Sequence, residues 1–467
     1  MFNFKALQEY GYNVLMSGYN VFLTGDAGTG KTYLLRMFIN EQRKLGRNIM
    51  VCGPTGAASL HINGSTLHHQ FKAKVGPIVK HPIDSRVLLE LIDTDILVID
   101  EISMCRVDLF DYIITYILEA NKYRKRANKH IIQFVISGDF FQLPPIISDN
   151  DKEVLDAYYQ CDIGNGFAFN SKYWKLFDFK NIILTEIVRQ ESKEFITELN
   201  KIRVGDKSGI DYIMNNCSKA PIPDAINLYG KNNDAIEKNI SELNKLDSDL
   251  WTHEAIVLGA AKITDTNAEM NLALKVGARV MSLVNNIDKE SNQFIYSNGS
   301  LGTVVFIGDN YVTVEFDNGN IVNIEIYKWD IFRYSIDEKT KNNPLPKLIE
   351  EKIGEVYQYP LKLAYAVTIH KAQGQTYDSV NISPYTWDCG QLYVALSRVR
   401  NIDNLYLRYD IQPNYSVTSL RVIEFYNSIV HNANKDVDTT IDLIGNKKID
   451  FQDSDMNKIF GLLGGNR

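Results

Sequence analysis

One short segment constrains the fold of this chain more than any other. Residues 25–32 read G-D-A-G-T-G-K-T and match the phosphate-binding pattern G-x-x-x-x-G-K-[ST]. The segment follows the apolar run NVFLT (20–24) and precedes the helical stretch TYLLRMFINEQ (32–42). A strand, a glycine-rich turn and a helix in this order let backbone N–H groups and the positive end of the helix dipole surround a phosphate. We therefore expect an α/β domain that binds a nucleotide.

Side chains in this segment and after a later apolar strand suit the hydrolysis of ATP. Lys31 is expected to reach the β- and γ-phosphates, and the Thr32 hydroxyl is expected to bind Mg²⁺. Asp100 and Glu101 follow the run DILVI (95–99), where Asp100 would hold Mg²⁺ and Glu101 would deprotonate the attacking water. Such acidic pairs can also be helix caps, but a sheet shared with the phosphate loop favours catalysis. The other loop residues expected to contact the nucleotide are Gly25, Asp26, Ala27, Gly28, Thr29 and Gly30.

A third apolar strand leads into the segment SGDFFQLPP (137–145). The amide of Gln142 in this segment can bond both a γ-phosphate oxygen and the attacking water, so it can respond to hydrolysis. Taken alone, the segment could also be an ordinary loop that ends at its two prolines. Gln142 is therefore a candidate catalytic residue that depends on its context.

The distribution of short apolar runs predicts the organisation of the chain. Runs rich in β-branched residues and flanked by turn residues are typical of buried parallel strands. One set precedes residue 190 and a second set follows residue 250, so the sequence predicts two α/β domains in tandem. The first set lies at 20–24, 48–52, 95–99, 131–137 and 181–184, and the second at 255–260, 279–284, 361–367, 379–383 and 404–408.

A different pattern lies inside the second set. Residues 301–329 alternate apolar and polar side chains and are divided by Gly-Asp-Asn and Asp-Asn-Gly turns, which predicts a small antiparallel β module inserted in the second domain. A lysine-rich loop (337–352) follows before the apolar runs resume. Beyond about residue 430 the chain is polar and rich in Asn and Asp, which is typical of a tail.

Composition narrows the class of protein. A chain of 467 residues is too long for one compact core, and it contains no apolar run of the roughly 18 residues needed to span a membrane. Its five scattered cysteines form no C-x-x-C pair, which argues against a disulfide framework or a zinc site and fits a reducing cytoplasm. The net charge of −7 is unusual for a protein that binds phosphates. One basic cluster could bind nucleic acid or simply be a solvated face: Lys122, Arg124, Lys125, Arg126 and Lys129.

Several longer motifs, in order and in spacing, resemble the PIF family of superfamily-one helicases, with RecD and Dda-like enzymes close by. The resemblance covers roughly residues 5–410. Many ATPases share the motifs of the first domain, but the last two motifs point to a nucleic-acid motor. The motifs are VCGPTGAASLHINGSTLHHQF (51–71), DEIS (100–103), GDFFQLPP (138–145), LTEIVRQ (184–190), TIHKAQGQT (368–376) and YVALSRVR (393–400).

The resemblance implies a particular architecture. It predicts two tandem RecA-like P-loop domains with parallel sheets, plus a small inserted antiparallel β-barrel. The first domain would cover residues 1–187, with a short wedge near 71–86. The second would cover 188–286 and 361–430, the barrel 287–360 and the tail 431–467.

The resemblance also implies roles for further residues. Arg189 and Arg398 would be arginine fingers that stabilise charge on the γ-phosphate. Gln8 would read adenine, and Gly374 would contact the nucleotide. Residues implied in contacts with nucleic acid are Pro54, Thr55, Gly56, Thr66, His68 and Phe71 in the first domain, and Thr368, His370, Lys371 and Gln373 in the second. Phe140 and Phe141 are further candidates for stacking on bases, as is Phe71, although most aromatic residues belong to the core.

The function implied by the resemblance is a monomeric ATP-dependent helicase that uses Mg²⁺ and moves 5′ to 3′. Its partners would be single-stranded DNA and tailed duplex DNA, and it would not associate with a membrane. The stretch 106–130 keeps only the outline of the family's signature, which weakens the prediction of G-quadruplex unwinding. Alternatives are a translocase that displaces proteins without separating strands and an ATPase that acts as a switch. RNA also remains open as the track.

Overall fold

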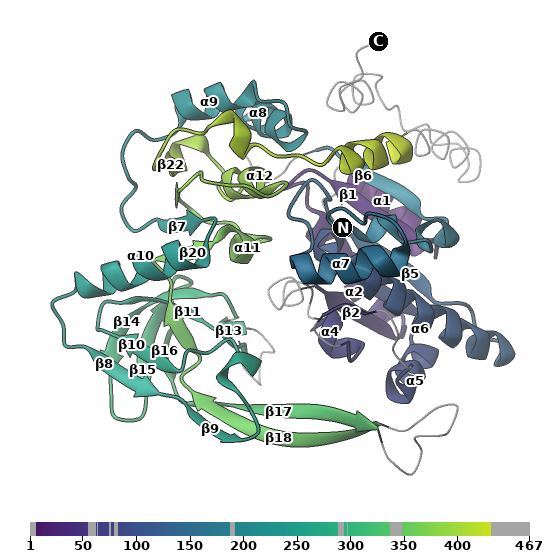
Figure 1. The fold of residues 1–467 in the computed structure, drawn as a ribbon, viewed down its shortest axis with the longest axis horizontal. Coiled ribbons are helices and arrows are strands. Elements are labelled where there is room, and N and C mark those ends of the chain that lie inside the picture. Colours follow the sequence, from purple (N-terminus) through teal and green to yellow (C-terminus); the bar gives the residue numbers. More distant parts are fainter. Residues whose placement is uncertain are drawn as a thin grey trace. The chain divides into compact units, whose positions relative to one another are not determined.

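The computed structural model describes residues 6–54, 62, 64–73, 76–78, 83–186, 192–287, 294–296, 298–336 and 348–430. The chain divides into two compact units (Figure 1). The first unit comprises Met1–Pro221, Gln373–Asp378 and Pro384–Arg467, and the second comprises Ile222–Ala372 and Ser379–Ser383. Within the described ranges, none of the helices combines the length and the apolar character needed to cross a membrane.

A six-stranded sheet forms the centre of the first unit. All neighbouring strands are parallel, and their order is β3-β2-β4-β5-β1-β6. Each of the five apolar runs predicted for this part of the chain forms a strand, so this prediction is confirmed. The strands are β1 (Val21–Gly25), β2 (Ile49–Gly53), β3 (Ser65–Thr66), β4 (Ile96–Ile99), β5 (Gln133–Ser137) and β6 (Lys180–Leu184).

Both faces of the sheet are buried by hydrophobic cores. Successive side chains of a strand point in opposite directions, so one strand contributes to both cores. In β4, Leu97 and Ile99 pack into one hydrophobic core, whereas Ile96 and Val98 pack into another. This explains why the strands are continuously apolar and do not alternate with polar residues. Helices α1 (Ala6–Met16) and α2 (Lys31–Lys44) contribute to one core, and α6 (Val107–Arg126) contributes to the other.

The remaining helices of the first unit surround this sheet or follow it in the chain. Helix α8 (Lys193–Arg203) is important for the site, and its first turn is capped by the Ser192 hydroxyl, which accepts a hydrogen bond from the Phe195 N–H at 3.3 Å. The others are α4 (Leu67–Gln70), α5 (Ser85–Asp93), α7 (Asp149–Tyr159), α9 (Gly209–Asn216), α12 (Gln391–Leu396) and the helix at residues 420–430. Strand β22 (Leu405–Leu407) and the short 3-10 helices Ile102–Met104, Ala168–Asn170, Trp174–Phe177, Ile402–Asn404 and Pro413–Tyr415 complete the unit.

The second unit contains a smaller parallel sheet. Strand β7 (Ile226–Tyr229) pairs on its two sides with β20 (Ala366–Thr368) and β21 (Val380–Ile382). Helix α10 (Asn232–Asn244) follows β7, and the short helix α11 (Ile369–Ala372) follows β20. The run that forms β7 was absent from the predicted strands.

Antiparallel strands make up the rest of the second unit. The module predicted at 301–329 is present as β14 (Leu301–Ile307), β15 (Val312–Phe316) and β16 (Ile321–Ile324), within a five-stranded sheet of order β16-β15-β14-β11-β19. Long strands β17 (Tyr327–Ile336) and β18 (Leu348–Gln358) pair with each other, and β9 (Ile256–Gly259) pairs with β18. Strands β8 (Trp251–Glu254), β10 (Asn271–Leu274), β11 (Arg279–Ser282), β12 (Asn286–Ile287), β13 (Phe294–Tyr296) and β19 (Leu361–Leu363), and the 3-10 helix Ile263–Asp265, complete it.

The structure corrects part of the predicted second parallel set. The runs at 255–260 and 279–284 form β9 and β11, which pair with antiparallel neighbours, as does β19 in the first half of the run at 361–367. A short β-branched run has the same composition in either kind of sheet, so composition could not separate them. The fold class is α/β with parallel sheets and a small antiparallel β region, as predicted, while the predicted domain boundaries stay a prediction.

Candidate nucleotide-hydrolysis site

The phosphate-binding segment connects β1 to α2 by a turn that requires glycine. Gly25 has a φ of 143° and Gly30 a φ of 82°, both in the region that L side chains rarely adopt. A Cβ atom on Gly25 would lie 2.1 Å from the Leu184 carbonyl oxygen, and one on Gly30 would lie 2.6 Å from Gln8 Nε2. The glycines therefore allow a backbone path that also packs tightly against its neighbours.

Lys31 is the first residue of α2, and its ammonium group lies inside this turn. Lys31 Nζ donates to the carbonyl oxygens of Gly25 at 2.8 Å and Asp26 at 2.9 Å. Burial lowers the pKa of Lys31, although the nearby carboxylates of Asp139 and Glu101 oppose this shift. The charge is thus placed where a phosphate bound by the loop would meet it.

Two carboxylates extend from the end of β4 beside the start of α2. The Thr32 hydroxyl donates to Asp100 Oδ2 at 3.2 Å, and Asp100 Oδ1 accepts from the Glu101 N–H at 3.0 Å. Burial raises the pKa of Asp100. A hydroxyl and a carboxylate at this separation are oxygen ligands of the kind that Mg²⁺ takes together with nucleotide phosphates.

Glu101 is held in an unusual backbone conformation. Its φ of 53° is in the left-handed region, which costs free energy for a residue with a side chain. Burial raises the pKa of Glu101, and the neighbouring charge of Asp100 raises it further. A carboxylate with a raised pKa is a better acceptor for the proton of an attacking water.

Lys31, Thr32 and Glu101 line a cavity of about 450 Å³. Gln142, Gly374 and Arg398 also line this cavity, and their contacts with the nucleotide stay a prediction. Arg398 is only 1% exposed, and its guanidinium donates to the carbonyl oxygens of Val394 at 2.6 Å and Gln375 at 3.0 Å. The buried arginine thus has a fixed position at the wall of the cavity. The full lining is Ala27, Gly28, Gly30, Lys31, Thr32, Tyr33, Glu101, Gln142, Gly374, Thr376, Arg398 and Arg400.

Gln373, which the resemblance placed at the nucleic-acid strand, lies at the hydrolysis site in this structure. Its Nε2 donates to Glu101 Oε2 at 3.3 Å, and the side chain is 5% exposed. This hydrogen bond favours the ionised form of Glu101. Gln373 directly follows α11 in sequence, so it links that helix covalently to the hydrolysis site.

The predicted adenine contact involves a residue that supports the phosphate loop. Gln8 lies in α1, is 5% exposed, and donates from Nε2 to the Thr29 carbonyl oxygen at 3.0 Å. Its role in reading adenine stays a prediction. Arg189, Thr55 and Gly56 lie outside the residues that the structure describes.

The other predicted nucleic-acid contacts in the first unit differ in accessibility. Pro54 follows β2 and is half-buried, and His68 is exposed in α4. Thr66 caps α4, where its hydroxyl accepts from the His69 N–H at 3.3 Å. Phe71 is fully buried, with its ring centre 5.8 Å from that of Tyr116, so it cannot stack on a base in this structure. Phe140 and Phe141 are likewise buried in the core.

In the second unit, three predicted contacts lie around α11. Thr368 ends β20 and is 6% exposed, and its hydroxyl accepts from the Lys371 N–H at 3.4 Å. Lys371 is exposed and His370 is half-buried. The Lys362 side chain lies near that of Lys371, and burial followed by this neighbouring charge lowers the pKa of Lys362 to about 8. The sequence contained no signal that would have identified Lys362.

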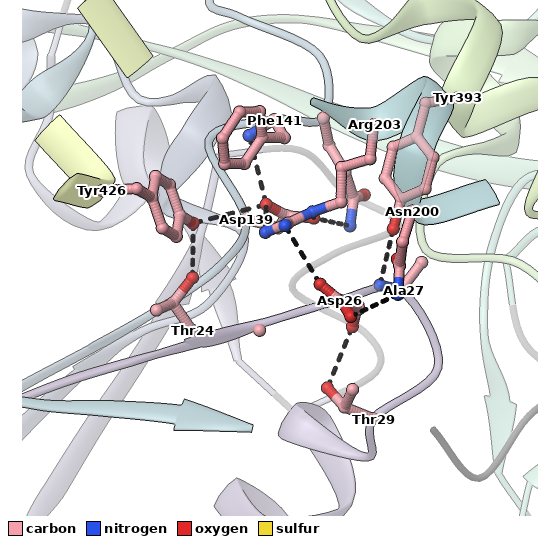
Figure 2. A network of polar contacts seen from close by, with 12 residues as sticks. Thr24, Asp26, Ala27, Thr29, Asp139, Phe141, Asn200, Arg203, Tyr393 and Tyr426 are labelled. Carbon is pink, nitrogen blue, oxygen red and sulfur yellow. Dashed lines mark hydrogen bonds and ion pairs between the residues drawn. The ribbon is translucent and has the colours of Figure 1, made fainter. Parts of the chain in front are cut away.

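A buried polar network adjoins the hydrolysis site (Figure 2). Arg203 of α8 forms ion pairs with Asp26 at 3.0 Å and with Asp139 at 2.9 Å. The Tyr393 hydroxyl accepts from the Ala27 N–H at 2.8 Å. Asp139 belongs to the predicted GDFFQLPP segment, but no motif marked Arg203, because a lone arginine in a helix is usually a surface residue.

The fold and this site define a P-loop nucleoside triphosphatase. A phosphate loop, the Thr32 hydroxyl, a candidate general base, an amide and an arginine meet at one cavity at the carboxyl end of a parallel sheet, and the Thr32 hydroxyl donates to the Asp100 carboxylate. Among the described residues, no cluster of three or more His, Cys, Asp and Glu side chains could hold a metal alone.

Comparisons with known proteins give the family. A family model described as PIF1-like helicase matches residues 6–210. The ATP-dependent DNA helicase Pif1 of Campylobacter jejuni is 28% identical over 88% of this chain and 93% of its own length. The ATP-dependent DNA helicase PIF1 of Xenopus laevis is 30% identical over 89% of this chain, which spans less than two thirds (63%) of that protein.

A solved structure supports the same family. The crystal structure of Bacteroides Pif1 bound to ssDNA is 31% identical, covers 92% of this chain and 97% of its own, and superposes with a TM-score of 0.72. The chain belongs to the PIF1-like helicase family, and its enzymatic class is that of an ATP-dependent helicase.

Proposed function

We propose that this chain is a DNA helicase that uses Mg²⁺ and ATP to move 5′ to 3′ along single-stranded DNA and to separate the strands of a duplex. The observation that carries the proposal is the convergence of Lys31, Thr32, Glu101, Gln142 and Arg398 on one cavity. The names of the relatives, several of which are ATP-dependent DNA helicases, support DNA as the track. The direction of movement rests on the resemblance to the PIF family.

Binding of ATP begins at the phosphate loop. The phosphates replace the carbonyl oxygens of Gly25 and Asp26 as the partners of Lys31 Nζ, because an ammonium group interacts more strongly with an anion than with a neutral carbonyl. Gln8 supports the loop from behind through the Thr29 carbonyl. Mg²⁺ arriving with ATP would be held by Thr32 and Asp100, and it would supply positive charge against the phosphate oxygens.

Hydrolysis uses the carboxylate of Glu101. Water attacks the γ-phosphorus, its proton moves to Glu101, and the bond from the γ-phosphorus to the bridging oxygen breaks to give ADP and phosphate. Gln373 orients Glu101 through its 3.3 Å hydrogen bond. Gln142 positions the water, and Arg398 stabilises the charge that develops on the transferring group, with Arg189 as a second cation.

Movement requires that the strand contacts change with the nucleotide state. Thr66 in the first unit and Thr368 and Lys371 in the second are the proposed contacts, through hydroxyl groups and one ammonium group. Gln373 connects the proposed strand contacts to the hydrolysis site, because it follows Lys371 by two residues in the chain and donates a hydrogen bond to Glu101. Alternating strong and weak grips during the hydrolysis cycle would then move the protein along the strand.

The test is strand separation on two duplexes, one with a 5′ and one with a 3′ single-stranded tail, beside Lys31→Ala. The proposal expects ATP-dependent unwinding of the 5′-tailed duplex alone, which the variant loses. Unwinding of the 3′-tailed duplex alone would refute the direction. Hydrolysis stimulated by single strands without any unwinding would favour a translocase that displaces proteins, and hydrolysis unaffected by single strands would favour a switch.

The proposed wedge needs a more careful variant than its deletion. In residues 71–86, Phe71 belongs to the core, the Ile78 N–H donates to Asp108 Oδ2 at 2.7 Å, and Asp84 caps α5. Deleting the whole segment would therefore destabilise the first unit. Replacing only residues 79–82 with Gly-Ser-Gly-Ser keeps these contacts. If this segment is the wedge, the replacement should lower unwinding while ATPase activity on single strands stays near that of the unaltered chain.

A further inference from the structure

We propose that Arg203 is a positioning residue for ATP hydrolysis, which acts by holding Asp139 and Asp26 and thereby fixes Gln142 and the phosphate loop. The inference rests on the proposed hydrolysis of ATP in the cavity described above. Arg203 itself does not line that cavity, and its effect would pass through the two carboxylates.

Arg203 and the two carboxylates form a buried cluster of charges. Arg203 is 7% exposed, Asp26 is 6% exposed and Asp139 is fully buried. The guanidinium uses its fork on Asp139, with Nε 3.1 Å from Oδ2 and Nη2 2.9 Å from Oδ1, and its third nitrogen, Nη1, is 3.0 Å from Asp26 Oδ1. Arginine suits this site because its planar group can address two carboxylates at once.

The contact with Asp139 leads to Gln142. The Asp139 carboxylate accepts from the Phe141 N–H at 3.1 Å, and the Gln142 N–H donates to the Asp139 carbonyl oxygen at 2.9 Å. Gln142 Nε2 lies 3.5 Å from Asp139 Oδ2, at the limit of a hydrogen bond. The guanidinium also stacks over the Phe141 ring at 4.3 Å from its centre. Arg203 therefore holds the carboxylate that orders the backbone turn before Gln142, whose side chain lines the cavity.

The contact with Asp26 leads to the phosphate loop. Asp26 follows Gly25 in that loop, and its carbonyl oxygen accepts from Lys31 Nζ and from the Thr29 hydroxyl. Asn200 lies one turn before Arg203 on α8, and its amide donates to Asp26 Oδ2 at 2.9 Å. One face of α8 therefore holds the loop through two side chains.

Charge balance explains why the position requires a cation. Burial alone would lower the pKa of Arg203, but Asp139 and Asp26 raise it well above its ordinary value. The same guanidinium keeps the pKa of Asp139 below its ordinary value although burial would raise it. Without Arg203, two buried carboxylates would face each other, and one of them would have to move or take up a proton.

A matched control is available elsewhere in the first unit. Arg124, near the end of α6, is 2% exposed and, like Arg203, binds its partners through every nitrogen of its guanidinium. Its partners are Asp95 and the carbonyl oxygens of Ile92, Thr94 and His130, none of which lines the cavity. Arg124→Lys therefore measures the cost of replacing a buried arginine where no catalytic group depends on it.

The first experiment compares Arg203→Lys with Arg124→Lys. Lysine keeps the charge but cannot bind two carboxylates with a rigid fork. We expect Arg203→Lys to lower kcat for ATP by about ten- to a hundredfold, with KM changed by less than about threefold, because misplacement of a catalytic group acts mainly on the chemical step. Arg124→Lys should lower the melting temperature at least as much and leave kcat near that of the unaltered chain. Equal kcat values for the two variants would overturn the proposal.

A second measurement separates positioning from general damage. If Arg203 acts partly through Gln142, then Arg203→Lys should lower kcat by less in a Gln142→Ala background than in the unaltered chain, because only its effect through the phosphate loop is left to lose. A loss of the same size in both backgrounds would overturn the route through Gln142. Binding of ADP with aluminium fluoride should weaken in Arg203→Lys while binding of ADP alone stays within about threefold.

The proposal stays testable if Arg203→Lys does not fold. Asp139→Asn keeps the shape of the side chain and leaves Arg203 paired with Asp26, so it removes the charge without crowding the core. It should lower kcat in the same manner as Arg203→Lys, and an unchanged kcat would overturn the proposal. Absence of ATPase activity in the unaltered chain would instead refute the proposed function, so the two failures are distinguishable.

Discussion

The hydrolysis site and Lys371, one of the predicted strand contacts, occupy different environments. Asp100 is buried, Lys31 and Glu101 are half-buried, their charges perturb one another, and each has defined partners. Lys371 is exposed, and its backbone N–H donates to the Thr368 hydroxyl at 3.4 Å. The comparison teaches that hydrolysis depends on a few pre-positioned groups, whereas strand binding spreads over weaker contacts.

The largest effect should follow removal of the phosphate-loop ammonium. Lys31→Ala should lower kcat for ATP by about a hundred- to a thousandfold, because one charge contact in the transition state is lost. Binding of single-stranded DNA without nucleotide should be unchanged, since Lys31 lies in the hydrolysis site and is not a predicted strand contact. ATP hydrolysis and fluorescence anisotropy with a labelled oligonucleotide measure the two. A loss of strand binding of similar size would mean that the two regions are not separable.

The next largest effect is expected for Phe71, which was predicted to contact the strand but lies in the hydrophobic core of the first unit. Phe71→Ala should lower the free energy of unfolding of the first unit by about 3–5 kcal/mol, because the ring is fully buried beside Tyr116. His68→Ala, three residues earlier and exposed, is the control and should change stability by less than about 0.5 kcal/mol. Denaturation by urea measures both. A stable Phe71→Ala variant with weaker strand binding would restore Phe71 as a stacking residue.

Phe71 also shows where prediction from the sequence reached its limit. The phosphate loop was predictable because phosphate binding requires its glycines and its lysine at a fixed spacing, and this spacing determines the path of the backbone. An aromatic residue in a strand-contact motif has no such signature, since a core position and a stacking position require the same ring. In the basic cluster around Lys122, Arg124 is buried against carbonyl oxygens, while Lys122, Lys125, Arg126 and Lys129 are exposed, so both readings of the exposed members stay open.

The ion cluster around Arg203 could not be predicted for a different reason. Its members come from the phosphate loop, the GDFFQLPP segment and α8, and they are far apart in sequence. Only the fold brings α8 against the carboxyl end of β1 and β5, so no local pattern records the contact. The second parallel sheet was only partly predicted because its strands are short and divided by a long antiparallel region.

A smaller effect is expected for a single strand contact. Lys371→Ala should weaken binding of single-stranded DNA by roughly fivefold at 0.15 M salt, and should reduce the slope of log affinity against log salt by about 0.7 to 0.9, as for loss of one phosphate contact. Lys44→Ala is the control, because Lys44 is exposed at the end of α2 and is not among the predicted contacts. Titrations at several salt concentrations measure the slope. An unchanged slope would exclude contact between Lys371 and a phosphate.

The smallest effect should be a dependence of strand binding on pH. Burial, and then the charge of Lys371, lowers the pKa of Lys362 to about 8, so the folded chain binds fewer protons at this residue than the unfolded chain between pH 8 and about 10.4. The contribution of Lys362 to stability therefore rises as pH rises through that window. A phosphate beside the two lysines would favour the charged form, so strand affinity should fall as pH rises, by up to about fourfold between pH 7 and 8.5. Lys362→Met keeps the aliphatic volume and should remove this dependence, measured by anisotropy at constant ionic strength. If the dependence persists in that variant, Lys362 is not part of the strand-binding surface, and the surface is reduced to exposed residues such as Lys371.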